Sequence, residues 1–258
     1  MINRDFHLHT VFSDGENTPE EIVLEALSRG MTAIGFSEHS YTPFDENGCL
    51  KRGGTDEYIE EISRLKEKYA GKITILCGIE QDIFSERADP RLDYSIGSVH
   101  FIEAGGGYIP VDLTADILHE AAERFFGGDA LSLAERYFDT VSRVLSVTGA
   151  DVIGHFDLIS KFNEGDRLFD GKSERYRAAW KRAADALLAA GKPFEINTGA
   201  VARGYRSECY PSGEIAAYIV ARGGRFILSS DSHRKETLCF GFDKYERAYG
   251  GYTVDTPV

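Results

Sequence analysis

The sequence of 258 residues is 42% hydrophobic and 28% charged, which is the composition of an ordinary globular protein. Its length suits one large domain, and we expect residues 1–258 to form a single domain. The formal net charge of −13, without a run of Lys and Arg, argues against nucleic acids and anionic membranes as partners. No apolar stretch is long enough to span a bilayer and no basic leader is evident, so we expect a cytoplasmic protein.

The cysteines are spread widely along the chain and form no Cys-x-x-Cys pair. This spacing favours neither a disulfide framework nor a zinc ribbon. We therefore expect free thiols at Cys49, Cys77, Cys209 and Cys239. The sequence gives no indication of the oligomeric state.

The first predicted strand covers residues 3–9 and carries a His-x-His pair. Side chains two residues apart point to the same face of a strand, so His7 and His9 can hold one cation between them. Imidazole is a common metal ligand, but such pairs also occur in strands without a metal. The pair indicates a metal site only if other ligands join it.

Helices are predicted between the strands that follow. The first begins at Thr18, which can cap it, with Pro19 in its first turn and Glu21 completing a capping box, and Gly30 ends it. Apolar residues at helical spacing predict further helices over residues 55–69, near 131–148, over 173–190 and over 212–222. The helix over 212–222 is the last one that the sequence clearly predicts.

Further buried strands are predicted within residues 32–37, 72–80, 93–100, 150–155, 193–198 and 225–233. Seven strands separated mainly by helices favour an α/β protein with a parallel sheet, most simply a closed barrel. The partly glycine-rich segments 41–54 and 103–114 would form lids or rims over one end of that barrel.

Most histidines share one position relative to the strands. Those at or just beyond the C-terminal end of a predicted strand are His7, His9, His39, His100, His155 and His233. Glu80 and Asp231 also end strands, and barrel enzymes build their active sites at this face. Asp14, on a turn with Gly15, can return to the same rim, although acids are common in turns without binding a metal. His119 is expected on the surface of a helix.

This set of side chains predicts a metal centre. Imidazoles and carboxylates gathered without a cation would be costly to remove from water, whereas metal ions turn them into ligands. Imidazole and carboxylate without thiolate suit zinc, iron(II) or manganese, and the sequence does not choose among them. Eight or nine ligands exceed the needs of one ion, so we expect two or three divalent ions.

Paired metal ions suit phosphoester hydrolysis, because a hydroxide held between them is a strong nucleophile at neutral pH. Cationic side chains would then be needed near the phosphate oxygens. Lys161 follows His155, and both Arg203 and Arg206 follow the strand predicted over 193–198. These three residues are candidates for phosphate binding, with a solvated surface charge as the alternative for each.

A series of short motifs runs along nearly the whole chain: His7-x-His9 with Ser13-Asp14-Gly15, Ser37-Glu38-His39, Gly78-Ile79-Glu80, Gly97-Ser98-Val99-His100, Gly154-His155-Phe156-Asp157 and Ser230-Asp231-Ser232-His233. The series resembles the ordered motifs of the PHP (polymerase and histidinol phosphatase) superfamily. The chain length and segments 97–102, 154–162 and 195–198 resemble its stand-alone histidinol-phosphate phosphatase branch.

The resemblance implies a distorted (β/α)7 barrel with a trinuclear metal site at the C-terminal ends of its strands. It implies that one metal is held by His7, His9, Glu80 and Asp231. Glu80 would bridge to a second metal that is also held by His100 and His155. The third metal would be held by Asp14, His39 and His233. The family often has Arg where this chain has Lys161, which offers a point charge in place of a bidentate fork.

We therefore expect a phosphomonoesterase that hydrolyses L-histidinol phosphate to L-histidinol and phosphate in histidine biosynthesis. A metal-bridging hydroxide would attack phosphorus while Arg203 and Lys161 hold the phosphate oxygens. Asp231, His233 or metal-bound water would protonate the leaving alcohol, and Glu38 could meet the substrate's ammonium group.

Two alternative functions remain open at the level of sequence. A PHP-type phosphoesterase could act on nucleotides or other small phosphoesters, although the negative charge of the chain counts against polynucleotides. A metal-binding protein without catalysis would explain the histidines. It would leave the candidate phosphate-binding cations without a role.

Overall fold

The computed structural model describes residues 2–45 and 48–258 of the chain. Within these ranges seven parallel strands form one sheet in the order β1-β2-β3-β4-β7-β8-β9. Their bounds are Arg4–Asp5 (β1), Ala33–His39 (β2), Thr74–Asp82 (β3), Tyr94–Ser98 (β4), Val152–Ile153 (β7), Phe194–Asn197 (β8) and Phe226–Ser229 (β9). The predicted α/β class and parallel sheet are confirmed.

The sheet closes on itself just beyond its first and last strands. Leu8 forms an isolated parallel bridge with Ser232. The amide of His9 donates to the Ser232 carbonyl over 2.9 Å, and the Ser232 amide donates to the His7 carbonyl over 3.1 Å. The regular part of β1 is therefore shorter than the strand expected over residues 3–9. The result is a nearly closed barrel, in agreement with the expected distorted (β/α)7 architecture.

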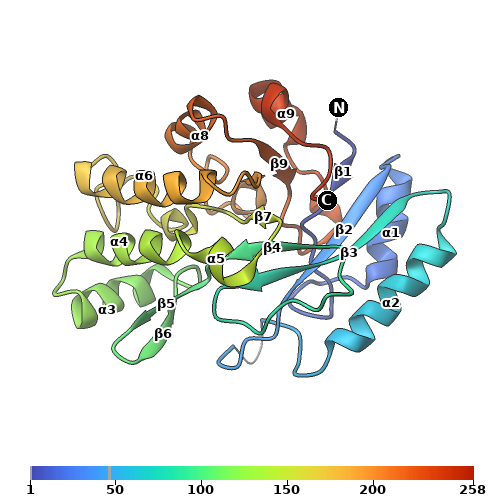
Figure 1. Cartoon of the computed structure of the whole chain (residues 1–258), viewed down its shortest axis with the longest axis horizontal. Coiled ribbons are helices and arrows are strands. Elements are labelled where there is room, and N and C mark those ends of the chain that lie inside the picture. Colours follow the sequence, from blue (N-terminus) through green and yellow to red (C-terminus); the bar gives the residue numbers. More distant parts are fainter. Residues whose placement is uncertain (1, 46–47) are drawn as a thin grey trace.

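Helices cover the outside of this sheet (Figure 1). In that view α1 and α2 lie beside β2 and β3 at one end of the molecule, and α3, α4 and α6 lie at the other end. The helix bounds are Pro19–Ser28 (α1), Thr55–Lys68 (α2), Ala115–Phe125 (α3), Ala130–Val141 (α4), Val144–Thr148 (α5), Glu174–Leu188 (α6), Gly199–Ala202 (α7), Gly213–Ala221 (α8) and Phe242–Tyr249 (α9). Short 3-10 turns lie at Leu158–Ser160, Lys235–Thr237 and Gly250–Tyr252.

The first helix begins as its sequence predicts. The Thr18 hydroxyl accepts a hydrogen bond from the amide of Glu21 over 3.3 Å, and the Glu21 carboxylate accepts one from the Thr18 amide over 2.9 Å. Pro19 occupies the first turn, where its missing amide hydrogen costs nothing. This capping box fixes where the chain leaves the loop that follows His9.

Three elements differ from the sequence-based expectation. The helix expected near 131–148 is divided into α4 and α5, because the chain turns at Ser142, whose hydroxyl donates to the Asp139 carbonyl over 2.7 Å. Helix α9 lies beyond the last helix that the sequence clearly predicted, and it buries Phe242 and Tyr245. The expected rim over 103–114 contains most of an antiparallel hairpin, β5 (Phe101–Ala104) and β6 (Gly107–Pro110). The other expected rim, 41–54, includes residues 46–47, which lie outside the described residues.

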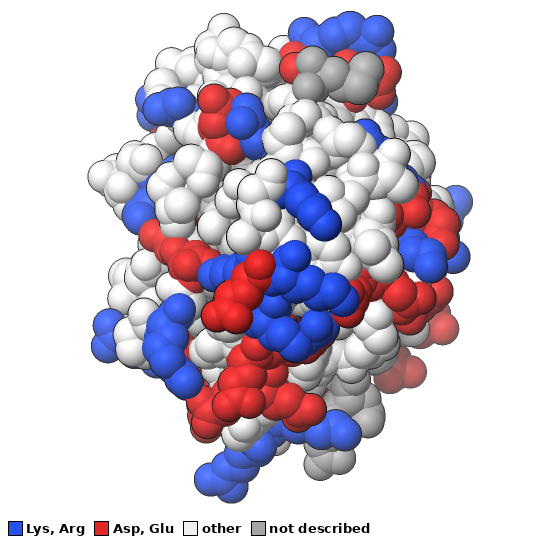
Figure 2. Space-filling view, turned by 90° about the vertical axis from the view of Figure 1, so that its right-hand side faces the viewer, with Lys and Arg blue, Asp and Glu red and all other residues white. Residues whose placement is uncertain are grey.

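The surface around α1 and α2 carries charges of both signs side by side (Figure 2). Arg64 lies 3.1 Å from Glu20, and Arg29 lies 2.7 Å from Glu25, so positive side chains on this face are locally neutralised. Among the described residues, no helix has the length and apolar character needed to cross a membrane.

The bottom of the barrel depends on glycines that make room for Tyr94. The ring of Tyr94 packs against the backbone of β2 and β3 at Gly35 and Gly78. Its hydroxyl donates to the carbonyls of Phe6 and Phe36 over 2.6 and 3.1 Å. A Cβ atom placed on Gly78 would lie 2.3 Å from this ring, and one on Gly35 would lie 2.4 Å from its hydroxyl. Two adjacent strands must therefore lack side chains at this level.

We predict that Gly78→Ala destabilises the fold by about 1–3 kcal/mol, because the added methyl group forces a buried ring out of its position. The measurement is the free energy of unfolding in urea. Gly251→Ala is the matched control, since a Cβ at this exposed position meets no atom within 4 Å among the described residues. Equal stability of the two variants would contradict this account of Tyr94.

Candidate metal centre

A cavity of about 1050 Å³ opens at the C-terminal ends of the strands. Its walls include the ends of β2 and β3, the hairpin β5–β6 and the segments that follow β7, β8 and β9. The cavity is therefore at the face where the sequence places its histidines and acids.

The first group of candidate ligands joins the ends of β1, β3 and β9. Nε2 of His7 lies 3.1 Å from Oε2 of Glu80, and Nε2 of His9 lies 3.5 Å from the same oxygen. Oδ1 of Asp231 lies 3.8 Å from Nε2 of His7 and 3.3 Å from Nε2 of His9. The φ angle of Asp231 is 50°, a left-handed conformation that aspartate tolerates better than most residues. All four side chains are buried.

A second group surrounds the same glutamate. Oε1 of Glu80 lies 2.8 Å from Nε2 of His155 and 3.3 Å from Nε2 of His100. Oε2 of Glu80 lies 3.0 Å from Nδ1 of His39. The hydroxyl of Ser98 donates to Oε1 over 2.6 Å and helps to fix the carboxylate. Glu80 therefore lies between two groups of histidines, as a bridging ligand would.

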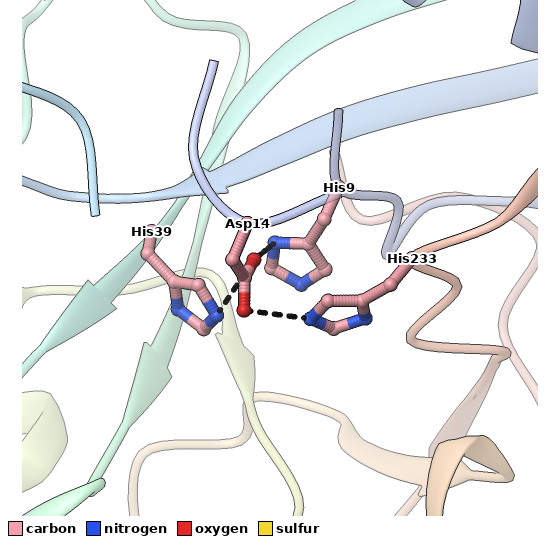
Figure 3. Close-up of side chains that lie close together, drawn as sticks. All are labelled: His9, Asp14, His39 and His233. Carbon is pink, nitrogen blue, oxygen red and sulfur yellow. Dashed lines mark hydrogen bonds and ion pairs between the residues drawn. The ribbon is translucent and has the colours of Figure 1, made fainter. Parts of the chain in front are cut away.

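The third group is centred on Asp14 (Figure 3). Its Oδ2 lies 3.1 Å from Nε2 of His233, and its Oδ1 lies 3.7 Å from Nε2 of His39 and 3.8 Å from Nδ1 of His9. The ring of His9 stacks with the rings of His39 and His233, and the ring centroids are 4.4 and 4.2 Å apart. The turn after His9 thus returns Asp14 to the rim.

The structure brings all the sequence-predicted ligands to one site. Within the described ranges, three sets have ligand atoms that all lie within 4.8 Å of one another: His9, Asp14, His39 and His233; His7, His9 and Glu80; and His39, Glu80 and His100. Because the sets share members, ions bound there would also share ligands. The assignment of each side chain to a particular ion stays a prediction.

The donor atoms of the first group fit a metal ion. Three buried atoms have no hydrogen-bond partner among the described residues: His7 Nε2, His9 Nε2 and Glu80 Oε2. The two nitrogens lie 3.1 and 3.5 Å from this Glu80 oxygen. Buried polar atoms without partners are costly, and a cation in the shared space would satisfy them together. Their chemistry, two imidazoles and a carboxylate, suits zinc, iron(II) or manganese.

The electrostatics of the cluster also favour positive charge. Burial by itself lowers the pKa of the His39 imidazole, but the carboxylates of Glu80 and Asp14 outweigh it and raise this pKa to about 9. Burial by itself raises the pKa of the Glu80 carboxyl, yet His7, His100 and His39 hold that pKa well below its usual range. The glutamate is therefore ionised, and the site attracts cations, whether protons or metal ions.

Glu195 contacts the candidate metal ligands, and the sequence analysis did not select it as a site residue. It lies on β8, is fully buried, and its Oε1 is 2.5 Å from Nδ1 of His7. Its Oε2 accepts hydrogen bonds from the amide of His155 over 2.9 Å and from the Asn197 side chain over 3.2 Å. A carboxylate that binds the outer nitrogen of a histidine fixes the ring for metal binding. The available signal was a charged residue between the apolar Phe194 and Ile196.

Asp82, at the end of β3, positions a second candidate ligand, His100. Its Oδ2 accepts a hydrogen bond from the amide of His100 over 2.7 Å and lies 3.4 Å from Nδ1 of that ring. Its Oδ1 accepts from the amide of Phe84 over 2.8 Å. Asp82 therefore holds the turn that presents His100, and the sequence offered no separate signal for it.

Two of the predicted cationic side chains line the cavity. The guanidinium of Arg203 lies 3.1 Å from Oδ2 of Asp231 and 2.9 Å from Nδ1 of His233. The ammonium of Lys161 donates to the backbone carbonyl of Asp112 over 2.7 Å. Both cations line the same cavity as the candidate metal ligands, and Arg203 contacts two of those ligands directly.

Two predicted substrate contacts are wrong in position. Arg206 is buried outside the cavity, where its guanidinium bonds to Glu208 over 3.2 Å and covers the ring of Tyr210 at 4.8 Å. Glu38 points to the opposite face of β2 from His39, because successive side chains of a strand alternate. Its buried carboxylate accepts hydrogen bonds from the amide of Thr10 over 3.1 Å and from the hydroxyl of Thr10 over 2.7 Å. Glu38 therefore fixes the turn before Asp14 and does not reach the cavity.

Comparisons with known proteins agree with this geometry. A model of the PHP domain family matches residues 5–199 of the chain. A probable histidinol-phosphatase from Deinococcus radiodurans is 30% identical, and the match covers 97% of this chain and 95% of the relative. The histidinol-phosphatase of Bacillus subtilis is 27% identical, with 99% of this chain and 98% of the relative covered.

Two solved structures have the same fold. A candidate histidinol phosphatase from Listeria monocytogenes has a TM-score of 0.82 at 22% identity, covering 94% of this chain and 99% of that chain. The histidinol phosphate phosphatase of Lactococcus lactis, solved with zinc, L-histidinol and phosphate, has a TM-score of 0.69 at 24% identity. That match covers 96% of this chain and 93% of that chain.

We predict that Glu195→Gln weakens metal binding by about 10- to 100-fold. The neutral side-chain amide of glutamine replaces the charged carboxylate that accepts from Nδ1 of His7, so the ring is oriented less firmly. The measurement is the metal retained per chain as a chelator is titrated into the purified protein. Glu120→Gln, an exposed position on α3, is the matched control. Identical retention curves for the two variants would contradict the positioning role of Glu195.

Proposed function

Because the chain belongs to the PHP domain family, we propose that it is a metal-dependent phosphoric monoester hydrolase whose substrate is L-histidinol phosphate. The observation that carries the proposal is one cavity that holds both the candidate metal ligands and two cations, Lys161 and Arg203. Ligands alone would suit a metal store, and cations alone would suit an anion-binding protein. Their combination suits phosphoester hydrolysis.

Metal ions bound by the candidate ligands would supply Lewis acidity and would lower the pKa of water. The side chains of the protein determine where the ester lies. Arg203 presents a planar fork of donors that matches phosphate oxygens, and its contacts with Asp231 and His233 fix its orientation. Lys161 adds a second positive charge on the cavity wall.

The leaving alcohol needs a proton, and two residues are placed to deliver it. His233 and Asp231 both line the cavity, and both contact the guanidinium of Arg203. A phosphate group held by Arg203 would therefore bring its ester oxygen close to one of these groups. Burial by itself raises the pKa of the Asp231 carboxyl, but Arg203 and His7 hold this pKa well below its usual range, so this carboxyl is ionised and has no proton to give. We propose that His233 donates the proton to that oxygen.

The remaining wall of the cavity suits the organic part of the substrate. Phe44, Phe101 and Tyr108 line it, and the rings of Phe44 and Tyr108 stack with centroids 3.8 Å apart. Aromatic side chains of this kind accommodate a planar ring such as imidazole. They would also accommodate a nucleobase, so a phosphoesterase that acts on nucleotides is the second candidate function. A metal-binding protein without turnover is the third, and it leaves Arg203 and Lys161 without a role.

We further propose that residues 1–258 act as one domain in the cytoplasm, on a small phosphorylated substrate and without nucleic acid. The cysteines, all of which lie in the described part of the chain, are free thiols, as expected in a reducing compartment. The net charge of −13 and the mixed charges of the face in Figure 2 disfavour binding to polynucleotides.

We predict that purified protein loaded with zinc, manganese or iron(II) releases inorganic phosphate from L-histidinol phosphate. His7→Ala should lose at least about 100-fold of kcat/KM, because it removes a candidate ligand from the buried cluster. A parallel screen with nucleoside monophosphates and a single-stranded oligonucleotide separates the candidate functions. Phosphate release that does not exceed that of His7→Ala would refute the substrate assignment.

We predict that Arg203→Ala lowers kcat/KM for the same ester by about 100-fold, since it removes charge-assisted donors from the phosphate. Arg203→Lys should recover part of this loss, because a point charge replaces the bidentate fork only in part. Metal content of both variants is measured alongside the rates. A loss of activity that follows loss of metal in both variants would contradict a direct role in phosphate binding.

A further inference from the structure

We propose that Asp112 and Lys161 together recognise a phosphate ester that carries an ammonium group on the carbon next to the phosphorylated one. In this arrangement Lys161 contacts the phosphate and Asp112 contacts the ammonium group. The inference rests on the proposed function and adds the residue that selects the substrate class. Asp112 thereby takes the role that the sequence analysis had given to Glu38.

The two side chains form an ion pair on the wall of the cavity. Nζ of Lys161 lies 2.7 Å from the carbonyl oxygen of Asp112 and 3.3 Å from its Oδ2. The Lys161 side chain is 11% exposed and that of Asp112 is 30% exposed, so the carboxylate is the more accessible partner. The ring of Tyr205 covers the ammonium of Lys161 at 4.8 Å and limits its movement.

Asp112 is held in place by the hairpin that precedes it. The amide of Val111 donates to the carbonyl of His100 over 2.8 Å, so the end of the hairpin is tied to a candidate metal ligand. Asp112 is the next residue, and it lines the same cavity as the cluster. Burial by itself raises the pKa of the Asp112 carboxyl, but Lys161, His100 and His155 hold this pKa below its usual range, and the group is ionised at neutral pH.

Other acids that line the cavity already have partners. Asp14, Glu80 and Asp231 contact the histidines of the metal centre. Asp82 accepts backbone hydrogen bonds with both oxygens, and Asp45 accepts one from the amide of Gly48 over 3.2 Å. Asp112 differs from them because its described partner, Lys161, is itself a candidate phosphate ligand.

A substrate that carries both charges can replace both halves of this ion pair. The phosphate takes over the contact with Lys161, and the neighbouring ammonium group takes over the contact with Asp112. A phosphate ester without an ammonium group must instead draw Lys161 away and leave the carboxylate facing a negative charge, which is costly in a half-buried site. Asp112 therefore favours amino-substituted esters, such as L-histidinol phosphate, over nucleoside monophosphates.

The test compares Asp112→Asn with the unmodified protein on two esters, L-histidinol phosphate and the same molecule without its amino group. For the amino ester, kcat/KM should fall by about 10- to 100-fold, as expected when a charged contact is lost. For the ester without the amino group it should fall less or rise, because the repulsion is removed. The ratio of the two kcat/KM values should therefore fall by at least about 10-fold.

Three further variants make the result specific. Asp112→Glu should restore part of the preference, because it restores the charge. Lys161→Met should lower kcat/KM for both esters alike, and Asp116→Asn, at an exposed position in the first turn of α3, should leave the ratio unchanged. An equal loss on both esters in Asp112→Asn would show that Asp112 only positions Lys161 and would overturn the inference alone. Phosphate release from neither ester by the unmodified protein would overturn the proposed function as well.

Discussion

The carboxylate of Glu80 is an anion inside the mouth of the barrel, with 1% of its side chain exposed. An ionised carboxylate in such a place costs several kcal/mol unless positive charge compensates for it. The surrounding imidazoles, which come from four different strand ends, supply hydrogen bonds and attract protons or metal ions to the same space. Glu195 and Asp82 then hold two of those rings in position. One buried acid thus ties together histidines from four strand ends at the mouth of the barrel.

Much of the fold follows from local sequence patterns. Apolar runs between the helices predict the strands, and the capping box at Thr18 predicts the start of α1. The division between α4 and α5 was not predictable in the same way, because a serine that bonds to its own helix looks like any other serine in the sequence. Helix α9 was missed because its eight residues include only a few apolar positions.

The candidate metal centre was predictable because its ligands end strands, and the ends of parallel strands meet at one rim. The partners of the residues that support the ligands were not predictable, because those partners are set by register across the barrel. Glu195 meets His7 from a strand 188 residues away. The wrong expectation for Glu38 has the same origin, since one step along β2 separates the face of His39 from the face that bonds to Thr10. Local sequence shows which residues can act, and only the fold shows which residues face one another.

The closure of the barrel between Leu8 and Ser232 has a consequence for how the protein matures. Asp14 and His233 are 219 residues apart, so the third ligand group cannot assemble on the ribosome until most of the chain has emerged. Metal uptake is then coupled to completion of the tertiary structure and not to any local segment. A ligand that binds only the folded chain adds about 2.7 kcal/mol of stability at a concentration of 100 times its Kd. A cell short of metal would accordingly contain chains that are inactive, less stable and more readily cleaved by proteases.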